Sequence, residues 1–144
     1  MNNRMGDEPL SEIVSICCDV STPYLISAKT LNGNQIQALQ RHLVGLGFYV
    51  GLIDALSGGD EASLITALDN AFQFPNYFGN NWNAVDECLA DMSWLPAKGY
   101  CCILSHAQVL RDRDKRIYDL FLDSFRYAAD RWQPDGVPFK LVLS

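Results

Sequence analysis

The sequence predicts an α/β fold in which a small parallel sheet of three to four strands is flanked by helices. Three observations support this. The chain has 144 residues, the size of one domain, and 49% of them are apolar, which allows a substantial core. Short apolar runs rich in β-branched and aromatic residues alternate with longer segments of helical periodicity. Strands separated by helices imply right-handed crossovers, so the strands should be parallel.

The first half of the chain predicts two strands and two helices. Residues 24–29 have the composition of a strand, and the turn-forming residues 32–34 start a helix. Residues 48–53 are apolar and β-rich, which predicts a buried strand, and Asp60 is a suitable N-cap for the helix that follows. The two helices have apolar faces at helical spacing: Ile36, Leu39, Leu43 and Leu46, then Leu64, Ile65, Leu68 and Phe72.

The second half predicts two more strands around a long helix. Residues 100–104 form a buried strand, and a short helix follows near Ala107. Asp114 caps a longer helix, and residues 139–143 form the last strand. The long helix has a continuous apolar face made of Ile117, Leu120, Phe121, Phe125, Ala128 and Trp132.

The N-terminal residues and the cysteines indicate in which cellular compartment the protein is expected to reside. Residues 1–9 are polar and lack the apolar stretch of a secretory signal, so we expect them to be disordered, with residues 10–144 forming a single domain. No apolar run approaches the ~20 residues of a membrane span. The five cysteines show no metal-binding spacing. We interpret all five as small buried side chains of a cytoplasmic protein.

Negative charge is concentrated in the middle of the chain. Between residues 51 and 100, seven acids stand against Lys98 alone, and no Lys or Arg occurs between residues 42 and 97. Such a block argues against direct nucleic-acid binding, which needs a basic footprint. It is suited to a positively charged partner. A merely solvated acidic surface is the alternative.

An aromatic loop and a short acidic helix form the most distinctive segment. Gly79 allows a positive φ or a close approach where the chain enters the helix, which Asn80 or Asn81 can cap. One side of the helix faces the core through Trp82, Val85, Cys88, Leu89 and Met92, and the other carries Asn83, Glu87 and Asp91, bordered by Asp86. The repulsion between Glu87 and Asp91, one turn apart, destabilises the helix by about 0.2–0.5 kcal/mol. Each acid in the last turn also lies at the negative end of the helix dipole, which costs about 0.3–1 kcal/mol. These small costs suggest a use for the charge, although an ordinary exposed face would show the same pattern.

The run Phe74-Pro75-x-Tyr77-Phe78-Gly79-x-Asn81-Trp82-Asn83-Ala84-x-x-Glu87-Cys88-Leu89 resembles the barstar family of ribonuclease inhibitors. The resemblance covers roughly residues 48–144 and leaves residues 10–47 as an N-terminal extension. It implies a small parallel sheet flanked by helices, and a protein that blocks a basic ribonuclease or nuclease-toxin active site inside the cell that makes the nuclease.

The resemblance also implies which residues bind the partner. Positions that contact the nuclease in the family are matched by Tyr77, Gly79, Asn81, Asn83 and Glu87. Compared with the family's type member, Asn83 is an amide in place of an acid, Glu87 is one methylene longer, and Asp86 replaces an aromatic. In the long helix, Tyr127 stands where an acid reaches the nuclease. We expect Asp86 and Asp91 to compensate for this redistribution of charge.

Three functions remain open. The first is an intracellular, immunity-type inhibitor of a ribonuclease. The second is a binding module for a basic partner that is not a nuclease. The third, a small enzyme, would need a nucleophile with a nearby base or a metal cluster, and the sequence offers neither pattern. We therefore expect no catalytic residue, cofactor or metal.

Overall fold

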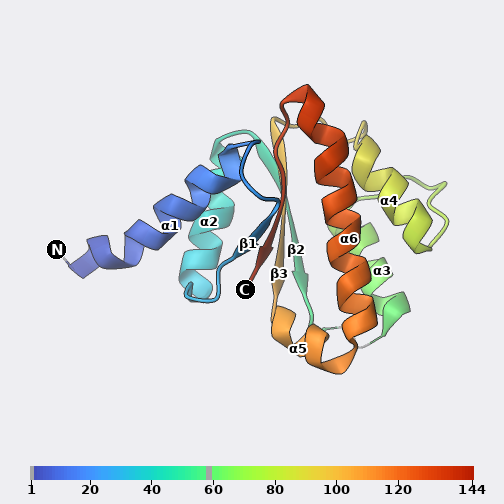
Figure 1. The fold of residues 1–144 in the computed structure, drawn as a ribbon, viewed down its shortest axis with the longest axis horizontal. Coiled ribbons are helices and arrows are strands. Elements are labelled where there is room, and N and C mark those ends of the chain that lie inside the picture. Colours follow the sequence, from blue (N-terminus) through green and yellow to red (C-terminus); the bar gives the residue numbers. More distant parts are fainter. Residues whose placement is uncertain (1, 58–59) are drawn as a thin grey trace.

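Four parallel strands form one sheet in the order β1-β4-β3-β2 (Figure 1), confirming the expected fold class. The computed structural model describes residues 2–57 and 60–144, and the side chains from residue 10 onward. Its elements are α1 (Asn2–Cys18), β1 (Leu25–Ser27), α2 (Gly33–Gly45), β2 (Phe48–Asp54), α3 (Glu61–Phe72), α4 (Trp82–Asp91), β3 (Gly99–Ser105), α5 (Ala107–Arg113), α6 (Lys115–Trp132), the 3-10 turn η1 (Gln133–Asp135) and β4 (Phe139–Leu143).

Strand β3 lies in the interior of the sheet, and its first six residues are all buried. It pairs over seven residues with β2, from Phe48 opposite Gly99 to Asp54 opposite Ser105. Strand β2 is an edge strand, because in the described part of the chain it pairs with β3 alone. The expectation of a buried strand here is therefore only partly met: Phe48 and Ile53 are buried, but Leu52 is 50% exposed. Its apolar composition resembles that of an interior strand, and only the strand order places it at the edge.

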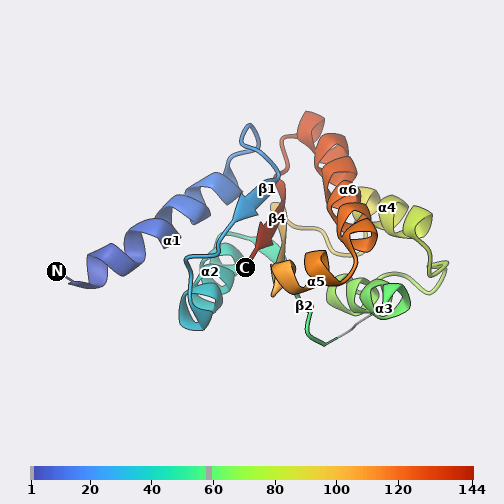
Figure 2. The ribbon, with the colours of Figure 1, turned by 60° about the horizontal axis from the view of Figure 1, so that its bottom comes forward.

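Each face of the sheet has its own core, and helices lie on both faces (Figures 1 and 2). Helices α3, α4 and α6 cover one face, where Phe72, Phe121 and Phe125 pack with ring centroids 5.1–6.1 Å apart in contacting pairs. Helices α1 and α2 cover the other. The adjacent residues Cys101 and Cys102 show the alternation, since Cys101 belongs to the second core and Cys102 to the first.

Local capping explains where the helices begin. Asp60 accepts a hydrogen bond from the Ser63 amide at 2.8 Å, and Asp114 accepts one from the Ile117 amide at 3.2 Å, so both expected caps are confirmed. The apolar face expected for α3 is also confirmed, because all four of its residues are buried. In α2 the expectation fails at Leu46, which lies at the C-cap and is 48% exposed. There the helix ends, so the periodicity no longer directs side chains into the core.

The N-terminal segment differs from expectation. Residues 2–9, which we expected to be disordered, belong to helix α1, and residue 1 lies outside the described residues. The cause is the apolar spacing that follows: Leu10, Ile13 and Cys17 are buried on one side of α1, against the sheet and α2. Cys18, the next residue of this helix, is exposed, which corrects the expectation that all five cysteines are buried.

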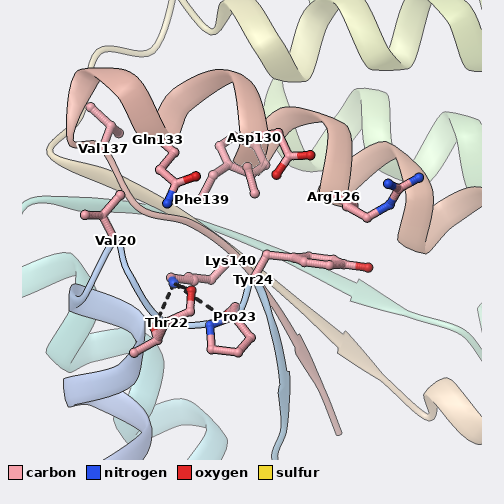
Figure 3. Close-up of a pocket in the computed structure, with 11 residues that line it drawn as sticks. Val20, Thr22, Pro23, Tyr24, Arg126, Asp130, Gln133, Val137, Phe139 and Lys140 are labelled. Carbon is pink, nitrogen blue, oxygen red and sulfur yellow. Dashed lines mark hydrogen bonds between the residues drawn. The ribbon is translucent and has the colours of Figure 1, made fainter.

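Lys140 of β4 attaches the end of α1 to the sheet (Figure 3). Its side chain is 2% exposed, and its Nζ donates to the Asp19 carbonyl (2.8 Å), the Thr22 carbonyl (2.8 Å) and the Thr22 hydroxyl (2.9 Å), with the Pro23 carbonyl at 3.4 Å. Burial lowers the pKa of this ammonium group, although nearby Cys17 and Asp19 oppose the shift. The N-terminal segment is therefore held by a buried charge as well as by apolar packing.

Candidate functional site

The loop between α3 and α4 directs one aromatic side chain inward and another outward. Phe74 is buried, and Phe78 packs against it with ring centroids 4.7 Å apart. Tyr77 is 73% exposed, the largest exposed fraction among the large apolar side chains described. Of these two neighbours, only Phe78 thus packs against the core. Tyr77 is therefore free to contact a partner.

The entry into α4 is built from Gly79, Asn80 and Asn81. The Asn81 side chain accepts a hydrogen bond from the Ala84 amide at 2.8 Å and donates one to the Gly79 carbonyl at 3.2 Å, so Asn81 is the cap. The positive φ falls on Asn80, at 55°, and not on Gly79. Gly79 instead meets the need for close approach, because a Cβ there would lie 3.3 Å from Asn81 Nδ2.

The two sides of α4 divide as the sequence predicts. Val85, Cys88, Leu89 and Met92 are buried, and Trp82 is half-buried. Asn83, Glu87 and Asp91 are exposed on successive turns, and Asp86 is half-buried beside them. An exposed polar stripe thus lies on a helix whose other side is fixed in the core.

Two tryptophans hold α4 in place through contacts that the sequence did not reveal. Trp82 Nε1 donates to Glu61 Oε1 of α3 at 2.7 Å, and Glu61 Oε2 also accepts from Arg116 Nη2 of α6 at 3.0 Å. Trp132 Nε1 of α6 donates to the Leu89 carbonyl at 2.9 Å. These contacts join residues 21 to 55 positions apart, so no local pattern could have predicted them.

Tyr77, Glu87 and Asp91 surround a single hollow of about 160 Å³ between the loop and α4. Phe78, Ala84 and Cys88 complete its lining. The loop thus contributes two aromatic side chains and α4 contributes two carboxylates one turn apart. This is a suitable environment for a cation with an apolar stem, the side-chain chemistry of Arg and Lys.

The electrostatic environment of the hollow is negative. None of the ion pairs formed among the described residues involves Asp86, Glu87 or Asp91. Burial raises the pKa of the Cys88 thiol, and the charges of Asp91 and Glu87 raise it further. Desolvation and then the Asp91 charge likewise raise the pKa of the Tyr77 hydroxyl. Both groups resist gaining a further negative charge, as expected where carboxylates have no cation beside them.

Asp86 has an unusual environment. Its Oδ1 is buried and has no hydrogen-bond partner among the described residues. Asp86 therefore adds a third carboxylate to the short helix that carries Glu87 and Asp91.

The seven residues predicted to bind a partner all lie on the loop or on α4, but they differ in what they can do. Tyr77, Glu87 and Asp91 share the hollow, and Asn83 extends the exposed stripe by one turn. The remaining three are Gly79 and Asn81, which shape the helix entry, and Asp86, which lies beside the stripe. Phe78 and Cys88 were not predicted as site residues. The loop motif contained Phe78, but only the fold shows that it closes the hollow.

The model of the family described as Barstar (barnase inhibitor) matches residues 49–144. The chain belongs to the barstar family. The match confirms the resemblance and nearly its full span, and the family is one of non-enzymatic inhibitors. A search of curated proteins returned no match.

In this barstar family member the matched region contains the loop, α4 and the strands β2, β3 and β4 apart from Phe48. Helix α1, strand β1 and helix α2 precede it, so the second core against α1 and α2 lies largely outside the family match. Among the described residues, no three or more His, Cys, Asp or Glu side chains group into a potential metal site. None of the described helices has the length and apolar character that a membrane crossing requires.

A second cavity of about 290 Å³ lies between α6 and the segment that leads into β1 (Figure 3). Arg126, Asp130 and Gln133 line it on the α6 side, and Lys140 lies on the opposite side. The Lys140 ammonium is already saturated by protein oxygens, so it has no free donor for a ligand. The residues that line this cavity include none of the candidate site, so we assign it no part in that site.

Proposed function

We propose that this barstar family member is an intracellular, immunity-type inhibitor that blocks the basic active site of a ribonuclease with α4 and the preceding loop. The supporting observation is the hollow, which combines the exposed ring of Tyr77 with two carboxylates that form no ion pair with any described residue. A ribonuclease binds RNA phosphates with Arg, Lys and His side chains. Carboxylates presented on a rigid helix imitate those phosphates.

The surface around the hollow fits this role. A partner's Arg or Lys inserted there would gain the Glu87 and Asp91 carboxylates as acceptors and stack its stem on Tyr77. It would also relieve the repulsion within α4. Because α4 is capped by Asn81 and tied to α3 and α6, little conformational entropy is lost when it binds.

The proposal predicts that Glu87→Ala weakens inhibition more than any other single surface substitution. Glu87 occupies the family's central anchor position and the middle of the exposed stripe. Loss of a carboxylate buried against a partner's cation costs about 2 kcal/mol or more, a range drawn in part from this family's own complexes. That corresponds to a loss of affinity of about 30-fold. The urea midpoint should stay normal or rise slightly, because repulsion with Asp91 is removed.

The experiment titrates a barnase-type ribonuclease with the wild type and the variant while RNA cleavage is followed. Glu12→Ala is the matched control, because Glu12 is an exposed glutamate on α1, on the opposite side of the sheet from α4. This variant should inhibit the ribonuclease as well as the wild type does. The on-rate should also fall as salt rises, since the acidic block steers association. Unchanged inhibition by Glu87→Ala with a normal urea midpoint would show that this face is not the interface.

A basic partner that is not a nuclease remains the second candidate. Asn83 and Tyr127 carry no charge at positions where the family's type member has acids, so the surface is not a copy of that inhibitor. Affinity capture with immobilised wild type and immobilised Glu87→Ala distinguishes the two. A captured protein that depends on Glu87 but has no nuclease activity would favour the binding module.

A further inference from the structure

Strand β2 has an unprotected outer edge. Gly47 O accepts from Lys98 N at 3.0 Å and Ala55 N donates to Ser105 O at 2.9 Å, so the odd-numbered residues direct their backbone groups towards β3. Because these directions alternate along a strand, the amides and carbonyls of Phe48, Val50 and Leu52 face outward. At Asp54 only the amide remains open, because its carbonyl accepts a hydrogen bond from Ser57 N at 3.1 Å. No described strand pairs with them.

The features that usually protect an edge strand are missing from β2. Proteins shorten edge strands, or place Lys, Pro or a bulge in them. Strand β2 has seven residues, no Pro or Lys, and one charged residue, Asp54, at its end. The opposite edge of the same sheet is β1, which has only three residues, with Pro23 shortly before it and Lys29 shortly after it. Only β2 is therefore open to pairing.

Exposed apolar side chains gather at this edge strand. Among the described residues, six large apolar side chains are exposed. Two of them, Tyr77 and Tyr127, lie on the candidate nuclease-binding loop and on α6. Leu52 lies within β2, Leu56 lies two residues after its end, and Val44 and Leu46 lie shortly before its start. Four of the six exposed apolar side chains thus lie in or beside β2.

The geometry points to a second copy of this chain as the occupant of the β2 edge, paired antiparallel about Gly51. In this register the outward-facing residues match each other: Val50 lies opposite Leu52 of the second copy, and Phe48 lies opposite its Asp54. The two-fold axis passes at Gly51, where closely spaced backbones meet without side chains. Leu46 and Leu56, each two residues beyond an end of β2, would also come together across the interface.

Charge favours this register. Lys98 lies against Gly47, next to the start of β2, because a Cβ on Gly47 would be 2.8 Å from Lys98 Cδ. Asp54 is at the other end of the strand, where its Oδ1 already contacts His106 Nδ1 and the Leu56 amide, each at 2.9 Å, and its Oδ2 has no ion pair among the described residues. Antiparallel pairing places the strand end that carries Asp54 in each copy beside the strand end next to Lys98 in the other, so opposite charges are neighbours at both ends of the interface. Parallel pairing would place like charges together.

Sedimentation equilibrium of the purified full chain tests the dimer. The expected mass is twice 16.1 kDa, and Leu52→Lys should give a folded monomer, because a half-exposed side chain is replaced and a buried charge would oppose pairing. Tyr127→Lys is the matched control and should remain dimeric. A wild type that is monomeric at about 100 μM overturns the inference, since a specific dimer should form there.

A charge exchange tests the register. Lys98→Asp and Asp54→Lys should each weaken the dimer, and the double variant should recover at least half of the lost affinity. A Leu52→Lys variant that is still dimeric would place the contact elsewhere and overturn the inference. A monomeric chain whose β2 amides become protected from hydrogen exchange only with an added extended peptide would assign the edge to another partner and also overturn it.

Discussion

At the scale of single residues, Lys140 is a buried charge that orders a distant segment. Its ammonium group binds oxygens of Asp19 and Thr22, which are 121 and 118 residues away in sequence. A hydrogen bond to a charged group contributes about 1.5–3 kcal/mol, and removing the donor leaves part-buried carbonyls unpaired. Lys140 therefore stabilises the fold through hydrogen bonds of its buried ammonium group, and not through the charge pairing of an exposed lysine.

We therefore expect Lys140→Met to reduce the free energy of unfolding by about 2–3 kcal/mol, although the apolar volume is retained. Lys29→Met, at an exposed lysine, serves as the control and should change stability by no more than about 0.5 kcal/mol. Urea denaturation followed by circular dichroism measures both. Equal midpoints for the two variants would show that the contacts of Lys140 add no stability.

The cysteines make a second prediction at this scale. All five are free, and Cys18 alone is exposed. Burial raises the pKa of Cys102 and Cys88. The interaction between the neighbouring thiols of Cys17 and Cys101 raises the pKa of Cys101 and lowers that of Cys17. Since Cys17 is itself fully buried, its lowered pKa does not make it accessible.

A disulfide reagent at neutral pH should accordingly modify one thiol rapidly in the folded protein and all five in denaturant. Cys18→Ser should abolish the rapid phase without changing the urea midpoint. A second thiol that reacts as fast in the folded Cys18→Ser variant would mean that α1 does not cover the sheet as described.

At the scale of elements, the position of α4 depends on its contact with α6. The Trp132 indole donates to the Leu89 carbonyl, which lies between Glu87 and Asp91 in the helix, and its ring packs on Tyr100 with centroids 5.3 Å apart. The ring provides apolar packing, whereas the Nε1 donor orients the helix. The two contributions can be separated by substitution.

Trp132→Phe should cost about 1 kcal/mol of stability, a shift of about 2–4 °C in Tm, and should also weaken nuclease inhibition several-fold. Tyr100→Phe is the control. It removes a comparable hydrogen bond, from the Tyr100 hydroxyl to the Leu95 carbonyl at 2.6 Å, outside α4. We expect the two variants to lose similar amounts of stability. Only Trp132→Phe should also lose inhibition. If inhibition falls equally in both variants, orientation of α4 by Trp132 is not important for binding.

At the scale of the whole molecule, the N-terminal segment converts one core into two. Leu39 and Leu43 of α2, with Leu10, Ile13 and Cys17 of α1, cover a sheet face that would otherwise expose Phe48, Cys101, Ile103 and Val142. Burial of one large apolar side chain contributes about 1.5–3 kcal/mol. The burial of several such side chains is therefore comparable to the net free energy of unfolding of a typical domain, about 5–15 kcal/mol.

Removal of residues 1–47 should therefore leave an aggregating or unfolded protein, whereas removal of residues 1–9 should leave inhibition intact. The shorter truncation ends before Leu10, the first buried residue described. Light scattering and urea denaturation compare the three proteins. A chain lacking residues 1–47 that is as soluble and as stable as the full chain would show that this segment is not part of the folding domain.

The sequence by itself determined most of the local structure and the position of the candidate site. Capping at Asp60, Asn81 and Asp114, the buried face of α3, the final strand and the exposed stripe of α4 follow from contacts within a few residues. Helical hydrogen bonds, caps and amphipathic spacing are local, so a pattern along the chain contains them. The loop motif was specific enough to indicate the family.

Only the tertiary structure decided which surfaces are open and which are covered. Strand order made β2 an edge and left Leu52 exposed, although its sequence resembles an interior strand. Packing against the second face of the sheet ordered α1 and buried the charge of Lys140. Packing of the loop and α4 on the first face joined Tyr77 to Glu87 and Asp91 in one hollow. The physical reason is that burial is set by neighbours distant in sequence, and no local pattern states which neighbours those are.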